Sequence, residues 1–369
     1  MSSLETQEAP ARETLQDDAA TSPRRPTGVA RLLAGAQLNK FSGLLILAAL
    51  IIVFGLLRPE TFLTLANARS ILATQAIVAV LAIGLLFPLA AGAFDLSAAQ
   101  NLGFSAVLCG VLLTKQDLPV PLAILVTLVV GGVIGAFNGF LVAVIGIDSF
   151  IATLGTTSLL LAGSQILAEG AFIGPLDDSF LAITDQKVFT LPIIVLYVAV
   201  LALLAWYVIE HSPLGRRIYA TGANPEAAHL SGVATKRLVF FSLVTSAVVA
   251  SAAGVLLAST LGSVSESIGP EYLLPAFAAV FLGTTQLKPG RFNVGGTLIA
   301  ILLLGTGVAG LQLLGAPIWV TALFNGIALI VAVGAVLMVK RVQERRAVRR
   351  AAQAARQVAA STPVASTTA

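Results

Sequence analysis

Residues 238–261 read LVFFSLVTSAVVASAAGVLLASTL and contain no charged side chain. A helix needs about 20 apolar residues to cross a membrane, so this stretch predicts a transmembrane helix. The run is continuous and lacks the strict two-residue alternation that is typical of a membrane β-strand. Its backbone groups must therefore be satisfied within a helix, which decides the fold class as an all-α membrane protein.

The rest of the chain has the same character in both directions from this run. Hydrophobic residues make up 57% of the sequence, charged residues 11%, and the mean hydropathy is +0.94. These values lie outside the range of soluble globular proteins. We predict a polytopic bundle of about ten transmembrane helices in one domain. The expected spans are 41–57, 68–91, 97–114, 118–145, 150–168, 189–209, 238–261, 271–285, 294–313 and 317–339.

Polar tails flank the apolar domain. Residues 1–38 are polar and mixed in charge, and we expect them to form a disordered N-terminal tail without a cleavable signal peptide. Residues 39–340 form the predicted membrane domain. Residues 341–369 form a basic C-terminal tail that we expect near anionic lipid headgroups.

The distribution of basic residues predicts the orientation in the membrane. If both termini are cytoplasmic, 18 of the 22 Lys and Arg residues lie inside and four lie outside. Positive charge concentrates on the cytoplasmic side of membrane proteins, so we predict cytoplasmic termini and a cytoplasmic segment 210–237. A nucleic-acid partner is not expected, because the chain lacks a basic face with interleaved aromatic residues.

A polar island, HSPLGRRIYATGANPEAAHLSGVATKR at 211–237, precedes the first-quoted run. Within it, Asn224 suits a helix N-cap, Pro225 suits the first helical position, and Glu226 suits the positive end of the helix dipole. Gly232 is a natural stop. These signals predict a helix of about two turns. So short a helix is unstable alone in water, and we expect it to dock onto a partner.

Ionisable residues are nearly absent from the predicted spans. No histidine lies in a span, and the single cysteine, Cys109, is expected to be a small buried apolar residue. The spans hold no ligand cluster for a metal and no paired carboxylates for an intramembrane enzyme. No Gly-Lys pair exists for a phosphate-binding loop. We therefore expect no cofactor and no catalysis, and any use of ATP must belong to a partner.

Asp95, within LAAGAFDLSAAQNLG at 89–103, is the one candidate charge inside a span. Pro88 and Gly92 before it predict a broken helix, which membranes tolerate only where the break is buried or faces a cavity. Asp95 can be the N-cap of the half-helix that follows. It can also lie on a transport path. The two interpretations are compatible, and both stay open.

Hydroxyl and amide side chains interrupt several spans, and small residues gather at 131–139 and 246–254. The polar residues are Asn101, Asn138, Thr153, Thr156, Thr157, Ser158, Ser164, Gln165 and Asn325. They can bond from helix to helix, or line a hydrated path for a polar, uncharged solute; the small residues predict close helix packing. Our candidates for a translocation path are Asp95, Ser97, Asn101, Phe150, Thr153 and Thr156.

Five segments carry a resemblance to a known family. They are FDLSAAQNL (94–102), NGFLVAVIGIDSFIATLGT (138–156), PLGRRIYATGANPEAAHLSGV (213–233), GPEYLLPAFAAVFLGTT (269–285) and GGTLIAILLLG (295–305). With these, the chain resembles the membrane-spanning permease subunit of bacterial ATP-binding cassette importers of the ribose type. The resemblance implies a type II-like importer permease fold and a place in the bacterial plasma membrane. It also implies uptake of ribose or a similar monosaccharide.

The same resemblance implies partners and a coupling site. The partners are two cytoplasmic ATPase subunits (or one fused tandem), an extracytoplasmic sugar-binding protein and a second permease copy, either identical or closely related. The family's coupling helix matches Pro225–Ser231, which would enter a groove on the ATPase, with Ala227, Ala228 and Leu230 as compact apolar contacts. The residues implied in coupling are Gly215, Gly222, Asn224, Glu226, Ala227, Ala228, Leu230, Ser231 and Gly232.

Two functions of other classes compete with the importer. An ion-coupled secondary carrier for a small polar solute would work without an ATPase, but such carriers usually keep several ionisable groups at mid-depth. Asp95 alone is thin support for it. A scaffold or receptor is the third candidate.

Overall fold

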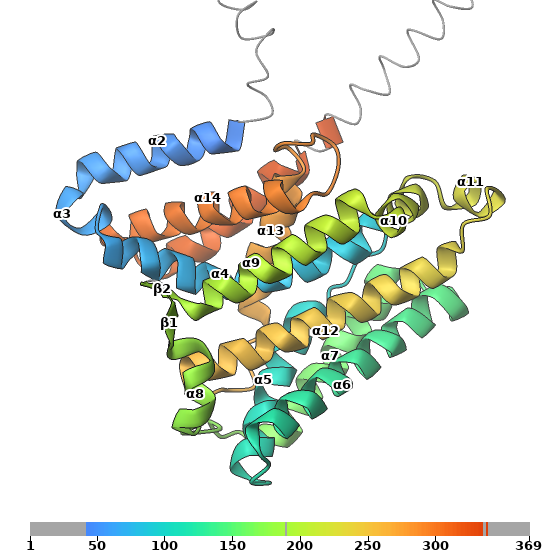
Figure 1. The fold of residues 1–369 in the computed structure, drawn as a ribbon, viewed down its shortest axis with the longest axis horizontal. Helices are drawn as coiled ribbons and strands as arrows, with labels where there is room; N and C mark the ends of the chain where they lie inside the picture. The colour runs from blue at the N-terminus through green and yellow to red at the C-terminus, as the bar shows by residue number, and fades with distance from the viewer. Residues whose placement is uncertain (1–41, 189, 335–336, 339–369) are drawn as a thin grey trace, which may run out of the picture. The chain divides into compact units, whose positions relative to one another are not determined.

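The computed structural model describes residues 42–188, 190–334 and 337–338. The predicted tails, 1–38 and 341–369, lie outside the described residues. Helices make up most of the described chain (Figure 1). The elements are α2 (Ser42–Leu57), α3 (Pro59–Phe62), α4 (Leu65–Ala90), α5 (Ala98–Thr114), α6 (Val120–Gly139), π-helix η2 (Phe140–Ile145), α7 (Ser149–Ala168), α8 (Asp178–Asp185), β1 (Lys187–Val188), β2 (Leu191–Pro192), α9 (Ile193–Trp206), π-helix η3 (Tyr207–His211), α10 (Pro213–Ala223), α11 (Pro225–Leu230), α12 (Thr235–Leu261), 3-10 helix η4 (Pro270–Tyr272), α13 (Leu273–Gly283) and α14 (Val294–Leu313). A further helix covers Trp319–Gly334.

The helical membrane class predicted from the sequence is confirmed. Within the described residues, six helical segments are long and apolar enough to cross a membrane. They are Leu65–Ala90, Val120–Ile145, Ser149–Ala168, Ile193–His211, Thr235–Leu261 and Val294–Leu313. Four apolar helices are shorter: Ser42–Leu57, Ala98–Thr114, Pro270–Gly283 and Trp319–Gly334. A helix is therefore present at each predicted span. Because four of these helices are short, the number of ten membrane crossings stays a prediction.

Helix α12, which contains the run that opened the analysis, packs against α4, α5 and α6. Its contact with α6 depends on glycines, because a Cβ at Gly135 would lie 2.6 Å from the Cα of Val244 and one at Gly131 would overlap the hydroxyl of Ser251. The two predicted small-residue stretches therefore pack against each other. Such close approach is how helices associate where lipid is as apolar as their side chains.

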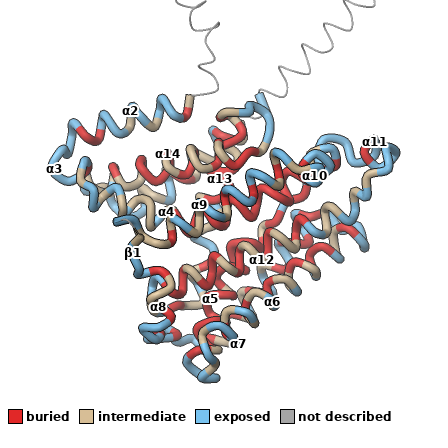
Figure 2. Tube along the Cα trace, in the orientation of Figure 1, coloured by how far each residue is buried: buried red, intermediate tan, exposed pale blue. Residues whose placement is uncertain are grey.

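Burial follows the same arrangement. The second half of α4 and the middle of α12 are buried, whereas α2, α6 and α7 expose much of their length (Figure 2). The exposed side chains on these outer helices are largely apolar, for example Ile52, Val133 and Ile151. These faces suit contact with lipid. Cys109 is fully buried, as predicted.

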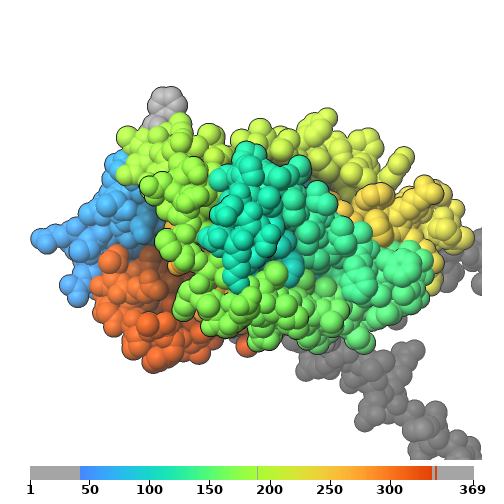
Figure 3. All heavy atoms as spheres, turned by 90° about the horizontal axis from the view of Figure 1, so that it is seen from below, coloured from blue at the N-terminus to red at the C-terminus, as the bar shows by residue number. Residues whose placement is uncertain are grey.

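The N-terminal helices lie beside C-terminal ones. Helix α14 contacts both α2 and α3, and the space-filling view shows the N-terminal segment in blue against C-terminal helices in orange (Figure 3). The start of α2 is held by Gln286, whose side-chain oxygen accepts the amide of Gly43 at 2.6 Å. Residues far apart in the sequence thus close one side of the bundle.

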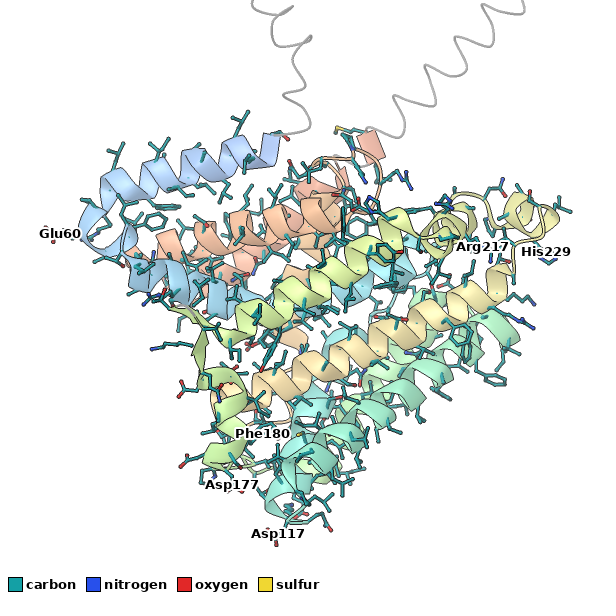
Figure 4. All side chains as sticks on the ribbon, viewed as in Figure 1. Glu60, Asp117, Asp177, Phe180, Arg217 and His229 are labelled. Carbon is teal, nitrogen blue, oxygen red and sulfur yellow. The ribbon has the colours of Figure 1, made fainter. Side chains whose placement is uncertain are left out.

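The charged side chains mark two opposite ends. Arg217 and His229 lie at the end formed by α10 and α11, and Glu60, Asp117 and Asp177 lie at the other (Figure 4). This separation is what the predicted orientation requires. We call the first the α11 end and the second the opposite end.

Candidate functional site

The backbone is not helical between α4 and α5. Helix α4 ends at Ala90, Gly92 has φ +84°, and regular helix resumes at Ala98. Only glycine adopts such a backbone readily. Helix α4 starts at the opposite end, and its 26 residues extend about 39 Å, more than the ~30 Å of a hydrocarbon core. The chain is therefore non-helical around Asp95, towards the α11 end, but Pro88 does not break the helix, because α4 continues through it to Ala90.

The Asp95 carboxylate is fully buried and fully bonded. Its Oδ1 accepts the Ser97 amide at 3.1 Å and the Ser97 hydroxyl at 2.6 Å, and its Oδ2 accepts the Ser246 hydroxyl of α12 at 2.7 Å. The N-cap position of α5 is Ser97 rather than Asp95, which corrects the expected register. Asp95 binds the amide of the N-cap residue Ser97, so it holds the start of α5 in place without being its N-cap.

The hydrogen bonds continue from Asp95 to two further helices. The Asn138 amide of α6 donates to the Ser97 hydroxyl at 2.8 Å, and the Thr156 hydroxyl of α7 donates to Asn138 Oδ1 at 2.6 Å. With Ser246, this chain of bonds joins α12, the broken segment, α6 and α7. A buried polar network whose members are satisfied rigidifies the helices it joins.

Helix α7 also satisfies the backbone of the break. The Phe94 amide donates to the Ser149 hydroxyl at 3.0 Å, and the Leu96 amide donates to the Thr153 hydroxyl at 3.1 Å. Buried amides left without partners would each cost roughly 1–3 kcal/mol. Ser149 and Thr153 therefore allow the helix break to exist.

A second group of bonds ties α5 to α12 further along. The Asn101 amide donates to the Ala247 carbonyl at 2.9 Å, and the Ser105 hydroxyl donates to the Ser251 hydroxyl at 2.9 Å. All four residues are buried. The interhelical bonding expected as one alternative for these polar residues is thus present.

Five of the six candidate path residues belong to this buried network. Asp95, Ser97, Asn101, Thr153 and Thr156 are each exposed by 4% or less, whereas Phe150 is 50% exposed and takes no part. The sequence did not single out Ser246 and Ser149 as partners. In the sequence, Ser246 is one hydroxyl within a small-residue stretch, and Ser149 is one hydroxyl at the start of a helix. Neither feature indicates a partner.

The polar island folds as two short helices. Ser212 caps α10 by accepting the Gly215 amide at 3.2 Å, and Asn224 caps α11 by accepting the Ala227 amide at 3.0 Å. Gly232, at φ +82°, follows the last turn. The predicted helix is confirmed, although it ends at Leu230, with Ser231 as C-cap.

The exposed face of α11 differs from the expected one. Leu230 is 88% exposed, and Glu226, Ala227 and His229 are exposed as well, but Ala228 is only 7% exposed. The carbonyl of Ala228 accepts the Val233 amide at 3.0 Å. Ala228 thus faces inward and cannot present its methyl group to a partner, which corrects that part of the expectation.

Helix α10 and the segment that follows α4 approach each other closely at two glycines. A Cβ on Gly222 would overlap the Ala90 carbonyl oxygen, and a Cβ on Gly92 would lie 3.1 Å from the Gly222 Cα. Only two glycines can approach this closely. The polar island therefore contacts the chain three residues before Asp95.

A second set of contacts, which we call the α10 clamp, joins η3 and α10 to the loop between α13 and α14. Lys288 pairs with Glu210, the Arg291 guanidinium lies 4.2 Å from the Tyr219 ring centroid, and the Tyr219 hydroxyl donates to the Phe292 carbonyl. Burial raises the pKa of Tyr219 to about 12, so the phenol keeps the proton that it donates. Sequence analysis missed these five residues, because only the fold brings them together.

Among the described residues, no three His, Cys, Asp or Glu side chains gather closely enough to hold an ion. What the arrangement offers is mechanical: an exposed short helix, a main-chain contact to a broken helix, and a buried network behind it.

Comparison with known proteins agrees with this picture. Residues 67–333 match the family model described as branched-chain amino acid transport system / permease component. The ribose import permease protein of Haemophilus influenzae is 31% identical over 80% of this chain and 91% of its own length. The D-allose transport system permease protein of Escherichia coli is 29% identical, over 75% and 85%. The autoinducer 2 import system permease protein of Photorhabdus temperata is 30% identical, over 69% and 78%. No solved structure matches the chain.

Proposed function

Because the chain belongs to the family of branched-chain amino acid transport system permease components, we propose that it is the membrane subunit of an ATP-binding cassette importer for a sugar. The relatives named above import ribose, D-allose and autoinducer 2. Two of these three are monosaccharides, and ribose or a similar monosaccharide is the solute that this resemblance favours.

One observation of the structure carries the link to an ATPase. Helix α11 is capped at both ends and lies at the same end of the bundle as Arg217. Its Leu230 is 88% exposed. A leucine so exposed on a two-turn helix gains free energy by entering an apolar groove. We propose that a cytoplasmic ATPase subunit supplies the groove, with Leu230 and Ala227 as contacts and Gly232 ending the helix.

The route from this helix into the membrane follows the contacts of α10. Movement of α11 displaces α10, and Gly222 passes the displacement to Gly92 and the broken segment. The α10 clamp passes it to α13 and α14 through Lys288 and Arg291. In this proposal the Asp95 network is the closed inner section of the translocation path, and Ser97, Asn101, Thr153 and Thr156 separate when it opens, with Phe150 at its edge.

The remaining partners follow from the family. A second permease copy, identical or related, would complete the pathway, and an extracytoplasmic binding protein would deliver the sugar. The chain would lie in the plasma membrane with both termini in the cytoplasm, as the basic residues predict. The ion-coupled carrier is not favoured, since every relative named above is an import or transport system permease protein.

The experiment is uptake by proteoliposomes that contain the permease and the ATPase encoded beside it. We expect uptake of radiolabelled D-ribose or D-allose that requires ATP on the ATPase side and the binding protein on the other. Uptake that continues without the ATPase and follows an ion gradient would instead identify a secondary carrier.

A further inference from the structure

A cavity of about 490 Å³ lies between α4, α13, α14 and the helix Trp319–Gly334. Its volume is within the range of roughly 300–1,000 Å³ that small-molecule sites occupy. None of the six candidate path residues lines it. Of its polar lining residues, the sequence analysis named only Asn325 as able to line a hydrated path; the others could not be grouped with it before the fold was known.

The cavity belongs to the opposite end of the bundle. Its walls include Asn67 near the start of α4, Gln312 near the end of α14 and Thr321 near the start of the last helix. Helix α12 runs from α11 to the opposite end, and η4, which contributes Glu271, comes soon after it. In the predicted orientation the cavity is therefore in the extracytoplasmic half.

The lining is rich in neutral hydrogen-bonding groups. Thr74 and Gln75 project from α4, and Asn325 from the last helix; among the described residues, none of these three side chains has a hydrogen-bond partner. Asn325 is only 8% exposed. Gln75 is half-buried and Thr74 is exposed, so these groups open onto the cavity, where a ligand or water can supply their missing partners.

Gln75 is placed by a glycine on the facing helix. A Cβ at Gly305 of α14 would lie 2.7 Å from the Gln75 Cδ, so the amide lies across α14 where that helix has no side chain. Gly305 also lines the cavity. The Gln75 amide thus packs closely against α14 at Gly305, on the wall of the cavity.

The charges of the lining select the kind of ligand. Neither lysine nor arginine lines the cavity, and the one carboxylate, Glu271, is exposed. An anion would find no counter-charge here. Amides and hydroxyls, each able to donate and accept, match a molecule that carries several hydroxyl groups.

A neighbouring cavity provides a contrast. It has about 520 Å³ and lies between α2, α3, α4 and α14, but its lining is almost wholly apolar, including Leu47, Ile51 and Leu302. Thr306, adjacent to Gly305, faces this second cavity. The two cavities are similar in volume, but the first has many more hydrogen-bonding side chains in its lining.

We propose that the cavity between α4, α13, α14 and Trp319–Gly334 is the outward-facing binding site for a neutral polyhydroxylated solute, with Gln75 and Asn325 as its specificity-determining residues. The proposal rests on the importer function and adds to it a site and a ligand class. In this proposal the cavity is the outer binding site. It is separate from the Asp95 network, which closes the cytoplasmic section of the translocation path.

The test uses the complete transporter with its ATPase and binding protein, and D-ribose and D-allose as probes. Gln75→Leu and Asn325→Leu should each raise KM for the transported sugar about tenfold, since a buried sugar hydroxyl then lacks its partner. Maximal uptake and expression should stay unchanged. Gln75→Asn should restore part of the affinity, and Thr306→Val, the matched control in the apolar cavity, should leave KM as it was.

A second measurement does not depend on the sugar. Thr74→Cys should react with a membrane-impermeant thiol reagent added from outside, and saturating sugar should slow the reaction. The native Cys109 is fully buried and gives no background. Thr306→Cys should not react. If the wild type takes up sugar but the Leu variants keep its KM, or Thr74→Cys does not react, the site is wrong and the importer stands. If the wild type takes up neither sugar, the sugar importer itself is wrong, and the site falls with it.

Discussion

At the scale of single residues, Asp95 shows what one sequence can and cannot predict. Its charge inside an apolar run marked it as unusual, and Gly92 located the interruption between α4 and α5, whereas Pro88 lies within α4. The partners could not be predicted, because Ser246 and Ser149 are ordinary hydroxyl residues until the fold brings them within 3.0 Å of the break. A serine in a helix carries no sequence signal of which neighbour it will meet.

Replacing Asp95 tests the network directly. Asp95→Leu removes the acceptor for the Ser97 amide and for the Ser97 and Ser246 hydroxyls, so we expect a loss of about 2 kcal/mol or more in stability. Sugar uptake should be lost as well. Asp95→Asn keeps one oxygen as acceptor and should be milder in both respects.

The measurements are thermal unfolding in detergent and uptake at matched expression. Asp177→Leu changes an exposed aspartate at the opposite end and serves as the control, with both values expected near wild type. Normal uptake by Asp95→Leu would exclude this residue from the path.

At the scale of elements, α11 was predicted from its capping residues almost to the residue. Its orientation was not, because helical periodicity alone cannot say which side of a two-turn helix meets the rest of the protein. The structure answers this with Leu230 outward and Ala228 inward. We therefore propose Leu230, rather than Ala228, as the docking contact.

The variants of α11 should separate docking from folding. Leu230→Arg should abolish co-purification with the ATPase and reduce uptake more than tenfold, while the amount of permease in the membrane stays normal. Ala228→Arg should instead destabilise the α10–α11 segment, because an arginine cannot replace a buried methyl group. His229→Ala, on the exposed face, should be mild. Intact co-purification of Leu230→Arg would show that α11 is an ordinary loop helix.

The α10 clamp should matter for coupling more than for stability. Arg291→Ala removes a cation–π contact worth about 0.5–2 kcal/mol and frees the loop between α13 and α14. We expect ATP hydrolysis to continue while uptake per ATP falls several-fold. Arg291→Lys keeps the charge without the planar group and should be intermediate. Equal losses of hydrolysis and uptake would mean that the clamp serves assembly only.

At the scale of the whole molecule, the sequence predicted the helical membrane class and helices at each expected span. Apolar length was enough for this, because a membrane leaves few other folds open to the backbone. The small-residue stretches predicted close helix packing in these two regions. They could not predict that α6 and α12 would pack against each other. The outer cavity could not be predicted, since Gln75 and Asn325 are 250 residues apart in the sequence.

Orientation is tested by accessible thiols. The basic asymmetry predicts that Arg217 lies inside and Asp178 outside. In intact cells, Asp178→Cys should react with an impermeant reagent, and Arg217→Cys should react only after the membrane is made permeable. Labelling of position 217 in intact cells would reverse the topology.

The glycine pair at positions 92 and 222 has a consequence for how this protein can change over generations. Where two side chains meet, an enlargement of one is readily compensated by a reduction of the other. Here both partners are already glycine, and a methyl group at 222 would strike the carbonyl of Ala90, which no substitution can trim. A genetic selection for suppressors of Gly222→Ala should therefore return no compensating change at position 92. It should return changes that shift α10 as a body, at its η3 junction or in the clamp.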